Sequence, residues 1–185
     1  MKEPYFTGLA VAALFLSVHS LAKAESNMRV EDFNTVEALG WRTINDTVMG
    51  GRSTSSVSVK DGKLHFTGYL NTNSGGFTSS RTATQTWNLN KMTHVRVRVM
   101  GDGRTYQIRL HPDQRGIAYK YPFKTEADVW QTIDAPIAAF QATRRGTELD
   151  LPPPRPQDIA SVGFLLADRT DGSFELRVDW IEFAP

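Results

Sequence analysis

The chain has 185 residues, of which 40% are hydrophobic, 10% aromatic and 22% charged, with 21 Lys and Arg against 20 Asp and Glu. These values are ordinary for a folded domain and exclude a disordered or fibrous chain. The balanced charge gives no support to nucleic-acid binding, and the absence of cysteine excludes disulfides, thiolate zinc sites and iron–sulfur clusters.

The first 24 residues have the pattern of a secretory signal peptide. Lys2 gives a basic start, residues 8–18 form an apolar run, and Ala22-Lys23-Ala24 is a small-x-small cleavage motif. The alternative, a membrane anchor, needs about 20 apolar residues, and this run is shorter. We therefore expect cleavage after Ala24, a periplasmic or secreted protein, and a single domain over residues 25–185.

The first strand signals after that segment predict a β-hairpin. Residues 55–60 alternate polar side chains with Val57 and Val59, and residues 63–70 continue the alternation. Between them stands Asp61-Gly62, a dipeptide typical of a two-residue hairpin turn.

A second hairpin is predicted around Asp102-Gly103. With this turn, Val95, Val97 and Val99 lie opposite Leu110, Ile108 and Tyr106, so that one face of the pair is apolar. The other face then carries Arg96 opposite Arg109 and Arg98 opposite Gln107.

Residues 173–180 alternate again near the end of the chain, with Phe174, Leu176, Val178 and Trp180 on one side. Only residues 88–94 and 135–140 favour a short helical turn, and the proline-rich residues 152–156 favour an extended loop. Many short strands separated by Gly and Asn/Asp turns indicate an all-β antiparallel sandwich or jelly roll.

A search for catalytic and metal-binding patterns is mostly negative. His65 and His94 stand alone, and His111-Pro-Asp113 lacks a third metal ligand. The Asp168–Gly172 loop has too few oxygen ligands for a calcium loop, so a turn stabilised by Asp side chains is preferred. No nucleophile is placed beside a base, and we expect neither an enzyme nor a cofactor or metal.

Two glycine loops are more informative. Asn45–Ser53 and Asn73–Phe77 each contain a glycine pair beside short polar side chains, which permits positive φ and close backbone approach. They serve either as tight turns or as a recognition surface at one end of the sandwich. The candidate binding residues are Asn45, Asp46, Met49, Gly50, Gly51, Arg52, Gly75, Gly76 and Arg81, together with Arg96, Arg98 and Arg109 of the second hairpin.

The three hairpin arginines need acidic neighbours, because like charges directly opposite each other are unfavourable. We expect the strand over residues 173–180 to join their sheet, so that Glu175 and Asp179 interleave with them. The face is then neutral and solvated; without those carboxylates it would suit an anionic ligand.

Carbohydrate binding is the alternative function, and it requires exposed aromatic platforms. Tyr119 and Tyr121, two residues apart, are the candidates, although burial in the core is the preferred interpretation. All four tryptophans are also expected in the core: Trp41, Trp87, Trp130 and Trp180.

The sequence resembles the complex I intermediate-associated protein 30 family over roughly Val30 to Phe183. The segments that carry the resemblance, in order, are Trp41, Asn45-Asp46-Thr47-Val48-Met49-Gly50-Gly51-Arg52-Ser53, Phe66-x-Gly68, Gly75-Gly76-Phe77-x-Ser79-x-Arg81, Gly101-Asp102-Gly103-Arg104-x-Tyr106, Trp130, Gly163-Phe164-Leu165 and Gly172-x-Phe174-Glu175-Leu176.

This resemblance implies a galactose-binding-like β-sandwich and a non-enzymatic role, since mitochondrial members of the family are chaperone-like factors in building respiratory complex I. It carries no catalytic residue. The implied partner is a protein, and an exported chain would reach only a subunit of the membrane arm from outside. We expect a monomer, with a glycan as the alternative ligand.

Overall fold

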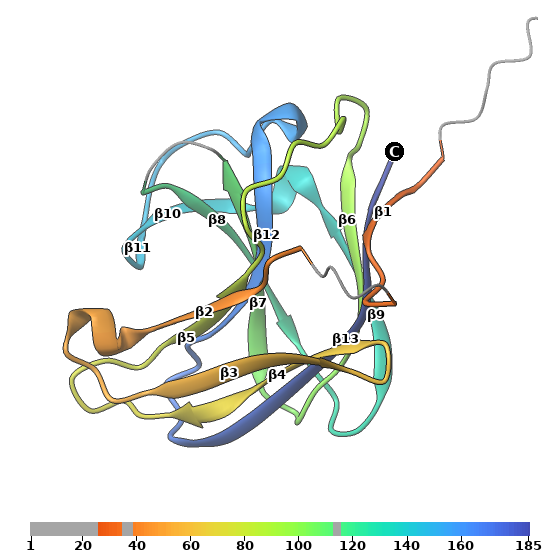
Figure 1. Ribbon diagram of the computed structural model, residues 1–185. Coiled ribbons are helices and arrows are strands. Elements are labelled where there is room, and N and C mark those ends of the chain that lie inside the picture. Colours follow the sequence, from red (N-terminus) through yellow and green to blue (C-terminus); the bar gives the residue numbers. More distant parts are fainter. Residues whose placement is uncertain (1–25, 35–38, 113–115) are drawn as a thin grey trace, which may run out of the picture.

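The structure is a computed structural model that describes residues 26–34, 39–112 and 116–185 (Figure 1). The expected signal peptide over residues 1–24 and the carboxylate of Asp113 lie outside the described residues. Within the described part of the chain, no helix is long and apolar enough to cross a membrane.

Two antiparallel sheets form the layers of a β-sandwich, which confirms the predicted fold class. The six-stranded sheet has the order β3 (Thr54–Lys60), β4 (Lys63–Leu70), β13 (Gly172–Ala184), β6 (His94–Met100) and β9 (Trp130–Pro136), with β1 (Met28–Glu31) also paired to β13. The seven-stranded sheet has the order β11 (Thr147–Glu148), β10 (Gln141–Arg144), β8 (Ala118–Lys124), β7 (Thr105–Pro112), β12 (Ile159–Leu166), β5 (Thr78–Arg81) and β2 (Arg42–Asn45).

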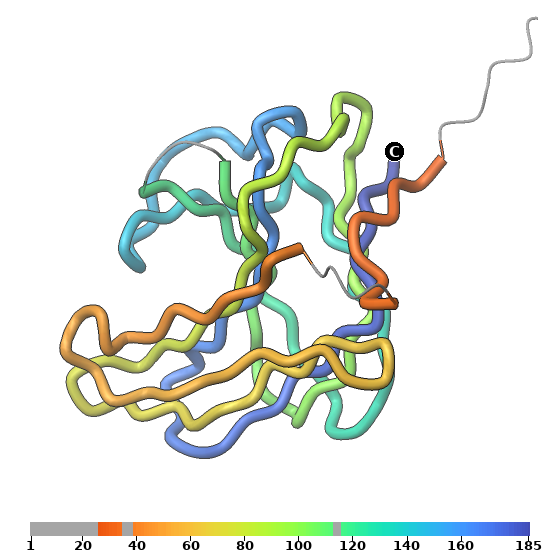
Figure 2. The backbone as a smooth tube through the Cα atoms, in the orientation of Figure 1, coloured from red at the N-terminus to blue at the C-terminus, as the bar shows by residue number. Residues whose placement is uncertain are grey.

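Neighbouring strands are often distant in sequence. The tube in Figure 2 shows β1 running beside the C-terminal strand, and the pairing of Met28 with Phe183 establishes this contact. Three short 3₁₀ helices complete the described elements: η1 (Asp46–Met49), η2 (Ile137–Ala139) and η3 (Pro156–Asp158).

The first predicted hairpin is confirmed as β3 and β4. Lys60 pairs with Lys63 and Val57 with Phe66, so the turn has two residues. Asp61 and Gly62 have φ values of 52° and 66°. Positive φ at both central positions is the property of a type I′ turn, whose twist matches that of the strands it joins.

The second predicted hairpin is wrong. β6 pairs with β13 and β9, whereas β7 pairs with β12 and β8, so the two strands belong to different sheets. The connection between them crosses the sandwich, and Asp102 fixes it by accepting hydrogen bonds from the Tyr106 hydroxyl at 3.0 Å and the Glu175 amide at 3.0 Å. Arg96 and Arg98 therefore do not lie opposite Arg109.

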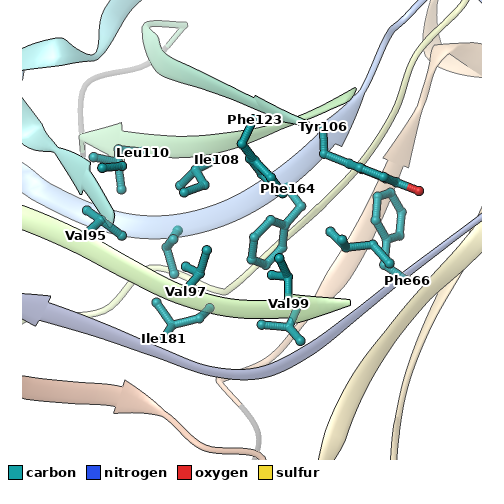
Figure 3. Packing of buried hydrophobic residues seen from close by; sticks show 14 of the residues in the cluster. Phe66, Val95, Val97, Val99, Tyr106, Ile108, Leu110, Phe123, Phe164 and Ile181 are labelled. Carbon is teal, nitrogen blue, oxygen red and sulfur yellow. The ribbon is translucent and has the colours of Figure 1, made fainter. Parts of the chain in front are cut away.

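The expected inward faces of those strands are nevertheless correct, because the apolar residues meet across the core instead of side by side. Figure 3 shows the β6 valines and the apolar side chains of β7 pointing into the space between the sheets. The six residues concerned are all fully buried: Val95, Val97, Val99, Tyr106, Ile108 and Leu110. Burial of these and the other core side chains is the main force that holds the layers together.

The last strand confirms the alternation over residues 173–178 and then departs from it. Leu176 and Val178 are buried, but the pairing with β6 shifts between Val178 and Trp180. Such a bulge adds one residue and reverses the inward and outward phase. Ile181 and Phe183 consequently face the core, and the prediction of a core position for Trp180 is wrong.

The other aromatic predictions divide between core and surface. Trp41, Trp87, Tyr119 and Tyr121 pack against the core, as expected. Trp130 is half-buried and lies beside the cationic groups of Lys63 and Arg98, at 5.9 and 5.7 Å from its ring centroid, so its predicted core position is not found.

The short irregular segments agree in part with expectation. The 3₁₀ helix η2 falls within the predicted window 135–140, whereas residues 88–94 form a turn that leads into β6. Residues 152–155 are an extended loop before η3 begins at Pro156.

Candidate functional site

The two glycine loops meet around the buried side chain of Asp46, the first residue of η1. One carboxylate oxygen accepts hydrogen bonds from the Ser53 hydroxyl at 2.6 Å and the Gly76 amide at 2.6 Å. The Phe77 amide donates to the same oxygen at 3.3 Å, and the other oxygen accepts a hydrogen bond from the Ser53 amide at 2.9 Å. Asp46 therefore fastens the Asn73–Phe77 loop to the Asn45–Ser53 loop.

The glycines of these loops make room for that carboxylate. A Cβ at Gly51 would lie 2.2 Å from Asp46 Cγ, and one at Gly75 would lie 2.3 Å from its Oδ2. Burial opposes ionisation of Asp46, but the hydrogen bonds from Ser53, Gly76 and Phe77 outweigh it, and its pKa lies below the ordinary value. The anchored carboxylate is thus ionised at neutral pH.

The two glycine loops are linked to each other, and the tip of the Asn45–Ser53 loop is exposed. The Asn45 side chain accepts a hydrogen bond from the Ser55 hydroxyl at 2.5 Å, and Gly50 ends η1 with φ of 87°. Val48 and Met49 at the tip are 71% and 66% exposed, and Arg52 is also exposed. Of the predicted loop residues, Met49 and Arg52 are therefore available to a partner, whereas Asp46 is committed to holding the loops.

The predicted arginine face is divided between the two sheets. Arg98 contacts Asp179 at 3.3 Å, which agrees with the expected place of β13 beside β6. Arg96 contacts Asp134 of β9 at 3.1 Å instead of a β13 carboxylate.

Glu175 was expected beside these arginines, and this is wrong. Its carboxylate contacts Arg177 at 2.9 Å and His65 at 3.2 Å. Together with the pairs of Arg96 and Arg98, these contacts neutralise the outer face of the six-stranded sheet, which leaves it poorly suited to an anionic ligand.

Arg109 lies on the outer face of the other sheet, where a cleft of about 510 Å³ opens. Arg42, Arg81 and Arg145 line the same cleft, and no Asp or Glu of the described residues does. Figure 1 shows the seven-stranded sheet curling, with β10 and β11 toward one end and β2 and β5 toward the other. Of the predicted site residues, only Arg81 and Arg109 are brought together here.

The strand registers explain why these arginines converge. Arg42 pairs with Arg81, Arg81 with Gly163, and Gly163 with Arg109. Residues that pair across an antiparallel sheet share one face, so the three arginines form a row across four strands. Gly163 is required in this row, because a Cβ there would lie 2.2 Å from the Ser80 carbonyl oxygen.

The positive charge of the cleft has no acidic partner among the described residues. Arg109 is held by hydrogen bonds to the Gln107 side chain at 3.0 Å and the Thr143 hydroxyl at 2.8 Å, both neutral. The Arg81 Nε atom is buried without a hydrogen-bond partner among the described residues. An unpaired buried donor costs free energy that a bound acceptor would recover.

This environment lowers the pKa values of two groups in the cleft. Burial lowers the pKa of Arg109 to about 10. Burial and then the charges of Arg81, Arg109 and Arg42 lower the pKa of His111 to about 3. His111 is consequently neutral at physiological pH and acts there as a hydrogen-bonding group without charge.

Other candidates from the sequence have structural roles. The Asp168–Gly172 loop is held by Arg104, whose guanidinium donates to the Asp168 carboxylate at 2.9 and 2.6 Å. His94 contacts the Thr93 hydroxyl at 2.7 Å. No group of three or more metal-ligating side chains occurs among the described residues.

The sequence did not predict that Arg42, Arg145 and His111 belong to one site. Their clustering depends on strand order, in which β2 follows β5 and β5 follows β12. The only sequence signal is Gly163, a glycine inside a strand, which indicates a close backbone approach.

Comparison with sequence families gives one match over most of the chain. A family described as complex I intermediate-associated protein 30 matches residues 29–178. The mitochondrial complex I intermediate-associated protein 30 of Mus musculus is 28% identical over 170 residues, which cover 76% of this chain and 51% of the relative. The Drosophila melanogaster protein of the same name is 30% identical over 138 residues, covering 69% of this chain and 46% of the relative. The chain thus spans about half the length of these curated relatives.

Comparison with solved structures supports the fold alone. A family 11 carbohydrate-binding module from a cellulosomal cellulase of Clostridium thermocellum has a TM-score of 0.62 at 17% identity, covering 87% of this chain and 95% of that module. An agarase structure has a TM-score of 0.60 at 8% identity, covering 87% of this chain and 25% of the agarase. These neighbours identify the sandwich as a jelly roll of the galactose-binding-like type.

Proposed function

Because the chain belongs to the complex I intermediate-associated protein 30 family, we propose that it is a non-enzymatic binding protein of the assembly-factor type, with a subunit of a membrane complex as its partner. Its mouse and nematode relatives carry complex I in their names. The chain covers only 51% and 28% of the length of those two relatives, and we propose that the shared domain carries this role.

The observation that carries this proposal is the open cleft on the seven-stranded sheet. Its lining carries four arginines, whereas the hydroxyl groups of Thr82, Thr143 and Ser161 donate to other groups of the chain. Such a lining supplies hydrogen-bond donors on a rigid sheet, which suits the holding of a partner. The exposed tip with Val48 and Met49 offers a second, apolar contact on the same protein.

Affinity capture tests the proposed role. The purified chain is immobilised and exposed to a detergent extract of membranes from the organism that makes it, and the retained proteins are identified by mass spectrometry. We expect enrichment of complex I membrane subunits over an unrelated immobilised β-sandwich. Equal recovery on both supports would contradict the assembly role.

We further propose that the chain is exported and acts as a monomeric single domain. The support is the leader pattern over residues 1–24, which ends in Ala22-Lys23-Ala24. Amino-terminal sequencing of the protein recovered outside the cytoplasm should begin at Glu25. An intact Met1 on protein that remains inside the cell would contradict export.

Carbohydrate binding is the second candidate function, and the two surface tryptophans favour it. The rings of Trp130 and Trp180 are half-buried on the outer face of the six-stranded sheet, where sugars would stack. The Arg29 guanidinium lies 4.3 Å from the Trp180 ring centroid and would have to move aside. Tryptophan fluorescence that stays unchanged across a panel of neutral glycans would exclude this use.

A further inference from the structure

We propose that the cleft of the seven-stranded sheet binds an extended acidic peptide segment, whose carboxylates are held by the row Arg42, Arg81 and Arg109. This inference rests on the proposed function as a protein-binding module and names the chemistry of what that module recognises. The cleft is distinct from the glycine loops, for which the sequence left open both tight turns and a recognition surface.

The arginines of the cleft lack acidic partners among the described residues. Six arginines elsewhere in the described chain form ion pairs with carboxylates, as Arg96 does with Asp134 and Arg98 with Asp179. In the cleft, Arg42, Arg81 and Arg145 make no ion pair with any described residue, and Arg109 contacts only neutral groups. Uncompensated charge in a partly desolvated hollow creates a positive potential that attracts anions.

The Arg109 side chain is preorganised by hydrogen bonds within the protein. The hydrogen bonds from Arg109 to Gln107 and Thr143 fix its guanidinium before any ligand arrives. The buried Nε of Arg81 has no acceptor among the described residues. A guanidinium presents donors in a planar fork that matches a carboxylate. The cleft therefore has one guanidinium, that of Arg109, which is oriented before a ligand binds.

The row of Arg42, Arg81 and Arg109 extends across four strands. Neighbouring strands lie about 5 Å apart, so the Cα atoms of Arg42 and Arg81 are about 5 Å apart. The strand of Gly163 lies between Arg81 and Arg109, whose Cα atoms are therefore about 10 Å apart. A row whose backbone positions span about 15 Å matches a ligand with several charges along its length better than a single carboxylate or phosphate. Gly163, between Arg81 and Arg109, leaves the path of such a ligand across the sheet free of a side chain.

The lining favours a peptide over a sugar chain. None of the described residues in the lining is Trp, Tyr or Phe, whereas sugar recognition relies on such platforms. In an extended peptide, side chains two residues apart point the same way and lie about 7 Å apart, within reach of flexible arginines along the row. Recognition of acidic motifs by arginine clusters is a recurrent mode of peptide binding.

The test uses fluorescence anisotropy with the full chain and a labelled Glu-Ser-Glu-Ser-Glu-Ser peptide, against a Gln-Ser-Gln-Ser-Gln-Ser control. We expect binding of the acidic peptide alone, weakening steeply as salt is raised. The variant Arg42→Gln/Arg145→Gln should weaken binding by about tenfold or more. Both residues are exposed, so the variant should remain folded.

A matched variant, Lys60→Gln/Arg169→Gln, removes the same charge from exposed sites outside the cleft. It should bind within about twofold of the unaltered chain, because long-range effects of exposed charges are screened. Equal losses in the two variants, or no binding at all, would overturn the proposal. Competition with an oligogalacturonate or with inorganic phosphate identifies other occupants: cleft-dependent binding of either one that exceeds peptide binding would also overturn it.

The inference and the proposed function fail separately. If capture recovers no complex I subunit but the peptide binds through the cleft, the assembly role is wrong and the anion site stands. If capture succeeds equally well with Arg42→Gln/Arg145→Gln, the role stands and the cleft proposal is wrong.

Discussion

Replacing Asp46 should separate the two glycine loops, because its carboxylate is their common hydrogen-bond acceptor. Ser53 donates through its amide and its hydroxyl, and the amides of Gly76 and Phe77 reach the same carboxylate. Asp46→Ala leaves the three amides without this acceptor, whereas the Ser53 hydroxyl can still donate to the Asn71 carbonyl oxygen at 3.1 Å. It also removes a side chain around which Gly51 and Gly75 are packed.

The magnitude follows from the number and type of the bonds. Hydrogen bonds to a charged acceptor contribute about 1.5–3 kcal/mol each, and part of this is recovered when water enters. Three of the four bonds are 2.9 Å or shorter. We therefore expect Asp46→Ala to lower the free energy of unfolding by about 3–5 kcal/mol. Asp46→Asn keeps one acceptor oxygen and should cost about half as much.

Urea unfolding followed by circular dichroism measures the change, and hydrogen exchange locates it. Exchange of the Ser53 and Gly76 amides should accelerate in Asp46→Ala even under conditions where the core remains protected. A loss below about 1 kcal/mol, together with unchanged exchange at those two amides, would refute the role given to Asp46.

The remaining predictions concern three other positions. The folded pKa of His111 is depressed to about 3, so its contribution to stability is fully present above the unfolded pKa of about 6.5 and is lost as the pH falls towards 3. At pH 5 this loss reaches at most about 2 kcal/mol, and His111→Gln should flatten the dependence of urea midpoints on pH; an unchanged slope would contradict this. Gly163→Ala should destabilise the chain by about 3 kcal/mol in the same assay, because its Cβ meets the backbone of Ser80; a neutral result would show that the strand is not so confined. Arg104→Gln should cost about 3 kcal/mol by stranding Asp168 in a largely buried pair, and a loss below about 1 kcal/mol would mean that solvent replaces that pair.

The layer architecture and many inward faces were predictable, because period-two alternation reports which side of a strand is buried. The first hairpin was also predictable, since Asp61-Gly62 specifies its turn locally. The alternation does not predict which strand pairs with which. The β6 valines would be buried equally well beside β7 or across from it, and nothing in the alternation distinguishes the two. The bulge before Trp180 was hidden for the same reason: residues 173–180 alternate without a break.

The site was less predictable than the fold. The glycine pairs correctly drew attention to Asp46, but its role in holding the loops depends on a contact across 30 positions of sequence. Arg81 and Arg109 were named for unrelated reasons, and their convergence depends on β12 lying between β5 and β7. Non-local pairing of this kind places Arg42 beside them as well, and no local pattern marks that residue.

The most direct test of a partner-binding cleft is nuclear magnetic resonance of the isotope-labelled chain during titration with the captured partner segment or, before it is known, with the acidic Glu-Ser peptide. The account predicts shifts at the guanidinium groups of Arg81 and Arg109 and at the Gly163 amide, all on the seven-stranded sheet. Shifts confined to the Trp130 and Trp180 indoles on the opposite sheet would contradict it.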